Sequence, residues 1–172
     1  GYWWAGEAPG SVMGSISQRI SYHNDTVMSS PRGYLPLTLP GEASYVTYKG
    51  DAAAVSSSNY AYNAGGDWHG KNADTAVSRL DYINDLATLL FKGNLATGRN
   101  NLAGVGNASY GYLAGGHPGN KSTVDRIDYS NDTPTAAAKG PLSTVRQNLG
   151  ATGSRENNLP TQNIYSTTAS SS

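Results

Sequence analysis

The stretch Tyr110–Leu142 occurs three times in this chain, and no other feature of the sequence constrains the fold as strongly. The clearest copy reads Tyr-Gly-Tyr-Leu-Ala-Gly-Gly, a short polar loop, Ser-Thr-Val-Asp-Arg-Ile-Asp-Tyr-Ser-Asn-Asp-Thr and, after a short gap, Lys-Gly-Pro-Leu. The middle copy begins at Tyr60 and the more diverged first copy at Tyr2, so the copies start 58 and 50 residues apart. The extra length of the first copy lies between Leu35 and Tyr60.

Each copy carries an Arg three residues before a Tyr, and an Asp three residues after that Tyr. These positions are Arg19, Tyr22 and Asp25; Arg79, Tyr82 and Asp85; and Arg126, Tyr129 and Asp132. A glycine pair follows the aromatic segment of the later copies, at Gly65 and Gly66 and at Gly115 and Gly116. Charged groups that recur in every copy indicate a scaffold, because a catalytic group is usually needed once. We expect a structural salt bridge or backbone hydrogen bond from the Arg in each repeat, and a turn at each Asn-Asp pair.

Runs rich in aromatic and β-branched residues, bounded by Gly, Asn, Asp and Pro, predict short strands throughout the chain. The predicted strands are Tyr2–Gly6, Ser15–Tyr22, Tyr45–Tyr48, Tyr60–Ala64, Thr75–Tyr82, Ala87–Phe91, Asn101–Gly106, Tyr110–Ala114, Thr123–Tyr129, Thr135–Ala138, Gln147–Thr152 and Asn163–Thr167. Leu86–Phe91 also fits a helix, but the equivalent Pro134–Lys139 contains a proline, which favours a strand. The prolines between Met28 and Leu39 restrict any strand there to a short or edge position.

Four short strands in a copy cannot bury a core alone, so we expect an all-β fold in which neighbouring copies stack. Four strands per copy, with Gly-Gly after the second, is typical of a β-propeller blade, and propellers have four to eight blades. Three blade-equivalents are therefore closed by oligomerisation, belong to a larger propeller, or form an open stack that other subunits cap. Repeat 1 covers residues 1–58 with an insertion at 34–58, repeat 2 covers 59–109, repeat 3 covers 110–158, and 159–172 is a tail.

Composition narrows the classes of partner and chemistry. The chain carries 12 basic and 12 acidic residues and no basic run, which gives no support for a nucleic-acid or anionic-membrane partner. It has no cysteine, which excludes disulfides, thiolate metal sites and a Cys nucleophile. No apolar run approaches the roughly 18 residues of a transmembrane helix, so we expect no membrane insertion. Because the chain begins inside a repeat, we expect further sequence before Gly1, present or removed by processing.

The order of an aromatic strand, Gly-Gly, a variable loop, a Val-x-Arg-x-Asp-Tyr strand and a polar turn resembles kelch repeats over nearly the whole chain. The amino-acid sequence of the third copy, from Tyr-Gly-Tyr-x-Ala-Gly-Gly to Lys-Gly-Pro-Leu-Ser, more specifically resembles a repeat in proteins of marine bacteriophages, especially those that infect cyanobacteria. Those proteins are thought to be virion appendage or tail-associated components. The resemblance implies a kelch-like β-propeller fold, a virion or extracellular location, and other virion proteins as partners.

The variable loops after Gly-Gly are the candidate contact sites for a glycan or a protein partner. They carry Asp67, Trp68 and His69 in the second copy and His117 in the third. Aromatic faces stack on sugar rings and carboxylates accept hydrogen bonds from hydroxyls; the alternative is a plain solvated loop. Two His in different copies do not form a metal site, which needs three or four convergent ligands. We expect no metal and no cofactor.

Three functions remain open from the sequence. The first is a structural or interaction component of a phage virion that acts through protein–protein packing, which the 12 tyrosines suit. The second is a carbohydrate-binding module that recognises host surface glycan through the loops after Gly-Gly. The third is a glycan-active enzyme with a catalytic group in an inserted loop. No nucleophile elbow and no phosphate-binding glycine loop are present, so we expect the chain not to be an enzyme, and we expect a homo-oligomer.

Overall fold

The computed structural model of the chain describes residues 2–4, 16–24, 26, 28–34, 49–67 and 73–153. These residues hold eleven β-strands and no α-helix, so the prediction of an all-β chain is confirmed for them. They include no helix that is long and apolar enough to cross a membrane. The predicted strands Tyr45–Tyr48 and Asn163–Thr167 lie outside the described residues.

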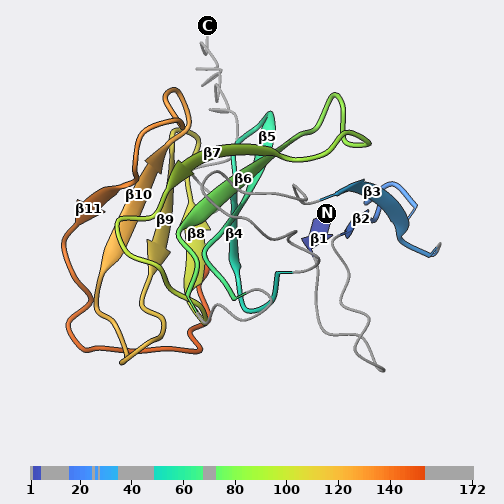
Figure 1. The fold of residues 1–172 in the computed structure, drawn as a ribbon. Helices are drawn as coiled ribbons and strands as arrows, with labels where there is room; N and C mark the ends of the chain where they lie inside the picture. Colours follow the sequence, from blue (N-terminus) through green and yellow to red (C-terminus); the bar gives the residue numbers. More distant parts are fainter. Residues whose placement is uncertain are drawn as a thin grey trace, which may run out of the picture.

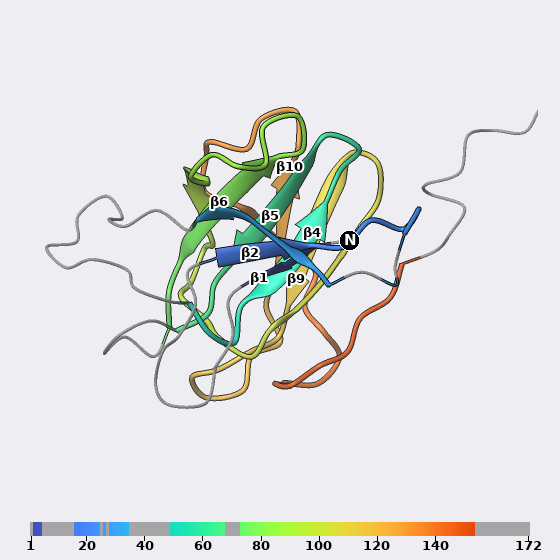
Figure 2. The same cartoon turned by 90° about the vertical axis from the view of Figure 1, so that its right-hand side faces the viewer.

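The strands form three antiparallel sheets, and every sheet follows chain order from one edge to the other (Figure 1). The second and third sheets each take their first strand from the end of the preceding repeat as the sequence bounds it. The first sheet holds β1 (Tyr2–Trp4), β2 (Ile16–Arg19) and β3 (Ser30–Tyr34). The second holds β4 (Ala53–Ser56), β5 (Tyr60–Ala64), β6 (Ala76–Asp81) and β7 (Leu90–Asn94). The third holds β8 (Ala103–Gly106), β9 (Tyr110–Ala114), β10 (Val124–Asp128) and β11 (Ala137–Lys139). Figures 1 and 2 show the first sheet beside the second, at the end of the row opposite β9–β11.

The strand register corrects the alignment of the first copy. The residues opposite one another are Tyr2 and Arg19, Tyr62 and Arg79, and Tyr112 and Arg126. Tyr2 is therefore equivalent to Tyr62 and Tyr112, whereas the sequence alignment placed it with Tyr60 and Tyr110. With this change the first two copies are 60 residues apart both at the aromatic strand and at the Arg, so the insertion falls entirely after β3.

Three predicted strands differ in the structure. Thr135–Ala138 is displaced to β11, Ala137–Lys139. Ala87–Phe91 is displaced to β7, because the turn after Asp81 extends over residues 83–86 and leaves Leu86 exposed. Gln147–Thr152 forms no strand, since the described residues offer it no partner for a β-ladder. The edge prediction for the proline-rich segment is confirmed: β3 contains Pro31 and lies at the edge of its sheet.

The core lies between the sheets, because each sheet is too small to enclose one. Ten buried residues fill the space between the second and third sheets, among them Tyr62, Val77, Leu95, Leu113 and Ile127. A smaller group, Ala61, Leu80 and Leu89, is covered by Tyr2 from the first sheet and by Tyr82. Small residues set the spacing of the sheets. A Cβ on Gly104 of β8 would clash with the Ala54 carbonyl oxygen of β4.

Gly93 of β7 gives a test of this close approach. Its N–H donates to the Asp132 carbonyl oxygen at 3.0 Å, and a Cβ on it would clash with the Pro134 carbonyl oxygen. We expect Gly93→Ala to lower the free energy of unfolding by about 1–3 kcal/mol, because the backbone of β7 must move away. Gly140 is the equivalent glycine of the third copy and has nothing within 4 Å of a Cβ, so Gly140→Ala is the matched control. Both variants are measured by urea titration at low protein concentration. Equal losses in the free energy of unfolding for the two variants would contradict the packing described.

Candidate functional site

The carboxylate of Asp132 joins the second sheet to the third. Asp132 follows β10 in the third sheet, and its Oδ2 accepts hydrogen bonds from the Tyr62 hydroxyl at 3.0 Å and from Arg79 Nη1 at 2.7 Å. Lys92 Nζ lies 3.4 Å from Oδ1. All three donors belong to the second sheet, on β5, β6 and β7. We call Asp132 and these three residues a carboxylate cluster.

An equivalent carboxylate cluster joins the first sheet to the second. Asp85 Oδ2 accepts from the Tyr2 hydroxyl at 2.9 Å and from Arg19 Nη1 at 2.7 Å, and Arg32 Nε lies 3.1 Å away. The same three strand positions of the preceding sheet thus point at the Asp of the following sheet. The contact is a repeated device of the fold, made once for each neighbouring pair of described sheets.

Two stacked tyrosine pairs accompany the clusters. The ring centroids of Tyr62 and Tyr129 are 5.2 Å apart with 15° between the planes, and those of Tyr2 and Tyr82 are 5.1 Å apart with 13°. Each pair again takes one ring from each sheet, and each places apolar area beside the charged groups. Arg79 also lies over the Tyr60 ring, with its guanidinium carbon 4.1 Å from the centroid, which holds the side chain toward the next sheet.

The cluster at Asp132 is largely buried, so its stability depends on the presence of all its members. The side chain of Asp132 is 6% exposed and that of Arg79 17%. Burial raises the pKa of the Tyr62 phenol, and the charge of Asp132 raises it further, so the hydroxyl remains a donor far into the alkaline range. Removal of one member would leave the others desolvated without a partner, which costs more than the net contribution of the intact contact.

A second pair of charges lies deeper, where the connecting segments enter the next sheet. Arg99 and Asp125 are both completely buried and form an ion pair of 3.0 Å; Arg99 also donates to the carbonyl oxygens of Thr123 and Leu113. Lys49 takes the matching place in the second sheet, where it donates to the Ala76 carbonyl at 2.9 Å and pairs with Asp74 at 3.1 Å. Burial raises the pKa of the Asp125 carboxyl, and Arg99 opposes that rise. These buried ions fix each connecting segment to the sheet that it enters.

These contacts change two expectations. The Arg of each repeat was expected to form a bond in its own repeat, but Arg19 and Arg79 pair with an Asp of the following one. Asp85 and Asp132, expected to serve as turn residues, are the acceptors. The turn is held instead by the preceding Asp: the carboxylates of Asp81 and Asp128 accept from the N–H groups of Ile83 and Ser130. Asp25 lies outside the described residues.

The sequence analysis does not identify the other members of the clusters. It aligns Tyr2 with Tyr60 instead of Tyr62, and it assigns no role to Arg32, Lys92, Lys49 or Arg99. The sequence holds one signal for them. A basic residue directly precedes the repeated glycine in every copy, as Arg32-Gly33, Lys92-Gly93 and Lys139-Gly140.

The glycine pairs end β5 and β9, which finish at Ala64 and Ala114. All four glycines have positive φ, from +66° to +110°. A Cβ on Gly116 would lie 2.6 Å from the Asn100 carbonyl oxygen, and one on Gly65 would lie 2.5 Å from the Arg99 carbonyl oxygen. Glycine is therefore required where the connecting segment crosses the end of a sheet.

The candidate contact loops are only partly described. Asp67 forms an isolated bridge with Gly50, and His117 forms the matching bridge with Asn100, so the two residues occupy equivalent places in different sheets. Trp68 and His69 lie outside the described residues. Within the described ranges no three His, Asp or Glu side chains gather in a way that could hold a metal ion. The glycan hypothesis therefore stays a prediction.

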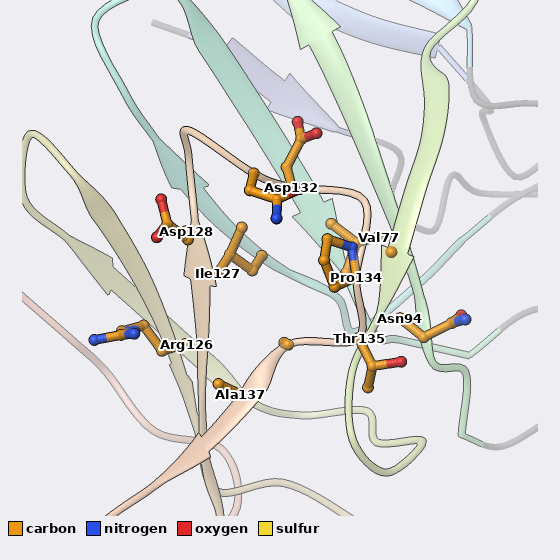
Figure 3. A pocket seen from close by; sticks show the side chains of 12 residues that line it. Val77, Asn94, Arg126, Ile127, Asp128, Asp132, Pro134, Thr135 and Ala137 are labelled. Atoms are coloured by element: carbon orange, nitrogen blue, oxygen red, sulfur yellow. The ribbon is translucent and has the colours of Figure 1, made fainter.

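A small cleft opens next to the cluster of Asp132 (Figure 3). It measures ≈ 160 Å³, and Val77, Ile127 and Pro134 are among its lining residues. In Figure 3, Val77 of the second sheet and Ile127 of the third point into it from opposite sides. This volume is well below the roughly 300–1,000 Å³ of a typical ligand pocket, so we interpret the cleft as a packing gap between sheets.

The carboxylate cluster predicts a large effect of Asp132→Ala. We expect the free energy of unfolding to fall by about 3–5 kcal/mol, because Arg79, Lys92 and the Tyr62 hydroxyl lose their shared acceptor. Asp128→Ala is the control, since the Asp128 carboxylate accepts from Ser130 within its own turn and joins no second sheet. Urea unfolding followed by tyrosine and tryptophan fluorescence measures both. A loss in Asp132→Ala no greater than in the control would contradict a structural role for the cluster.

The tyrosines predict a loss of stability in alkali. The pKa values of Tyr62, Tyr82 and Tyr129 are raised above the ordinary 10.0, chiefly by burial. Stability is therefore full below pH 10 and falls as the pH rises toward the folded-state values, by about 1.4 kcal/mol per pH unit for each phenol that ionises only on unfolding. Tyr62→Phe should be less stable at pH 8 but lose stability less steeply above pH 10. Identical slopes in urea titrations of the two proteins would rule out this linkage.

Comparison with known proteins assigns the chain to no family. No protein-family model matches it, and no curated protein sequence matches it either. The kelch and phage resemblances therefore stay predictions, and function is argued from the contacts above.

Proposed function

We propose that this chain is a structural interaction module of a phage virion, part of a tail or appendage, which acts through the packing of kelch-like β sheets. The single observation that supports this most is the repeated carboxylate cluster. The groups that resemble catalytic machinery, Arg79 with Asp132 and Arg19 with Asp85, are used to hold one sheet to the next.

The propeller form of the fold belongs to the same proposal. Two features support it: each complete sheet is a four-stranded antiparallel meander, and the first strands β4 and β8 are in contact. Neighbouring sheets of a propeller pack in this way around an axis. A further regularity is the chain of backbone bonds from Asn148 N–H to Asn101 O and from Asn101 N–H to Asp51 O. All three residues have a positive φ near +50°, so the segments before the second sheet, before the third sheet and after the third sheet share this conformation.

An array of sheets held together in this way is suited to assembly more than to chemistry. Its tyrosines and arginines are the residue types enriched in protein interfaces, and they recur at matching places in each sheet. Location in a virion is supported by the amino-acid sequence of the third copy, which resembles repeats in phage appendage proteins.

The proposal is tested on purified phage particles that encode the chain. We expect mass spectrometry to find it at a fixed copy number per particle, and particles from a deletion mutant to lack a tail or appendage component in electron micrographs. Its presence in infected cells but absence from purified particles would overturn the proposal.

Glycan binding is the outcome that would favour the alternative function. We expect no saturable binding of the chain to host lipopolysaccharide in solution. Binding that is lost in Trp68→Ala and in His69→Ala, with the fold unchanged, would replace the structural reading by host recognition through the loop that follows Gly66.

A further inference from the structure

The strand register sorts the side chains of the second and third sheets by face, because residues opposite one another in antiparallel strands lie on the same face. We call the face of the third sheet that points away from the second sheet its outer face. The outer face repeats the residues of the face that the second sheet turns toward the third. The matched pairs are Ala53 and Ala103, Val55 and Val105, Tyr60 and Tyr110, Tyr62 and Tyr112, Ala64 and Ala114, Val77 and Val124, Arg79 and Arg126, Asp81 and Asp128, and Lys92 and Lys139.

The other faces of the same two sheets do not match. The pairs there are Ala54 and Gly104, Ser56 and Gly106, Ala61 and Gly111, Asn63 and Leu113, Ser78 and Asp125, and Leu80 and Ile127. On the outer face, Ala137 at the edge of the sheet differs from its counterpart Leu90. The match is therefore a property of one face, the face that in the second sheet receives another sheet.

In the second sheet this face is covered. Tyr62 is 0% exposed and Val77 is 1% exposed, and both belong to the core between the second and third sheets. Their counterparts Tyr112 and Val124 are each partly exposed, and Lys139 is exposed. The outer face thus leaves open to solvent the residue types that the second sheet buries.

The cation of the outer face is held as its counterpart is, but it lacks an acceptor. The guanidinium carbon of Arg126 lies 4.3 Å from the centroid of the Tyr110 ring, against 4.1 Å for Arg79 over Tyr60. Arg79 donates to Asp132 at 2.7 Å, whereas Arg126 forms no ion pair with any residue that the structure describes. The outer face therefore presents the donor half of a carboxylate cluster.

Asp128 does not replace the missing acceptor. Figure 3 shows Arg126 and Asp128 on the same side of β10, but the Asp128 carboxylate is bonded within its own turn. Its counterpart Asp81 is bonded in the same way, and Arg79 nevertheless takes Asp132 of the next sheet as its acceptor. An Asp at this position is thus compatible with an acceptor that comes from outside the sheet.

The sheet that covers the second sheet shows what such a face accepts. It supplies the Asp132 carboxylate, and three residues earlier it supplies the Tyr129 ring, which stacks on Tyr62. It also supplies glycine at the close approach, since a Cβ on Gly111 would lie 2.5 Å from Val55 Cγ2. A partner of the outer face needs the same three features.

We propose that the outer face of the third sheet binds another β-sheet of this repeat type, carried by a separate chain, whose aspartate carboxylate accepts from Tyr112, Arg126 and Lys139. Charge complementarity favours such a partner, and the Asp85 and Asp132 carboxylates of the described residues are already engaged between this chain's own sheets. The inference rests on the proposed function as a packing module and states what the module packs against.

A lengthened chain tests whether the outer face accepts such a sheet. It is the whole sequence with a second copy of residues 107–153 inserted after Gly153, so the added copy brings its own Tyr129 and Asp132. The added copy is tethered, so even a weak contact is measurable. In urea titrations followed by tyrosine and tryptophan fluorescence, we expect Arg126→Gln in the original sheet to raise the equilibrium constant of unfolding at least about 50-fold.

Three comparisons isolate the contact. Arg126→Gln in the chain of natural length should change the equilibrium constant by less than about fivefold, because no acceptor is lost. In the lengthened chain, Asp132→Asn in the added copy should cause a loss similar to that of Arg126→Gln, and the two changes together should cost little more than either alone. Lys121→Gln removes a positive charge from a loop outside the outer face and should have the same small effect in both chains.

Crosslinking tests the contact on the chain of natural length, independently of whether the added copy folds. A photoreactive benzoylphenylalanine replaces Lys139, which is exposed on the outer face. In infected cells and in purified particles, we expect it to link to another chain, close to an aspartate that follows a tyrosine by three residues. The link should be lost in Arg126→Glu.

Each result decides between the possibilities. Additive effects of Arg126→Gln and Asp132→Asn in the lengthened chain, or crosslinks that lead only to residues of the same chain, would overturn the inference. Coupled effects and a crosslink in infected cells, with the chain absent from purified particles, would contradict the proposed function and leave the inference standing. A chain present in particles, without coupling and without a link to another chain, would do the reverse.

Discussion

A carboxylate shared by three donors of the preceding sheet is the contact on which the rest of this structure depends. The sheets bring short side chains such as Ala61, Ala64 and Gly104 to their contacts, which lets them approach closely but buries little apolar area at each point. Such surfaces can slide past one another. An ion pair of 2.7 Å and a stacked tyrosine pair at each boundary fix one position, and the buried Arg99 and Asp125 pair fixes the connecting segment.

This contact also gives the array of sheets a direction. The middle sheet uses both halves of the contact, because its Arg79 donates to Asp132 of the third copy while its Asp85 accepts from Arg19 of the first. In both cases the donors come from the preceding sheet and the acceptor from the following one, so neighbouring sheets are related in the same sense along the chain.

The sequence predicted the all-β class, the three copies, β5 and β9 to the residue, and the edge position of β3, because these follow from local spacing and from what Gly and Pro permit. It could not assign the partner of each Arg. Periodicity shows that Arg79 and Asp132 recur but not whether a bond lies within a repeat or across two, since that depends on how the sheets stack. The strand at Gln147–Thr152 failed for a related reason: its pattern is that of a strand, but a strand also needs an edge to join.

The account makes its most direct claim about the partner of Arg79. An experimental structure of the chain at side-chain resolution would place its guanidinium within hydrogen-bonding distance of the Asp132 carboxylate, with Tyr62 stacked on Tyr129. If Arg79 instead bonds within its own sheet while Asp132 faces solvent, the carboxylate contact does not join the sheets and the account of how they pack is wrong.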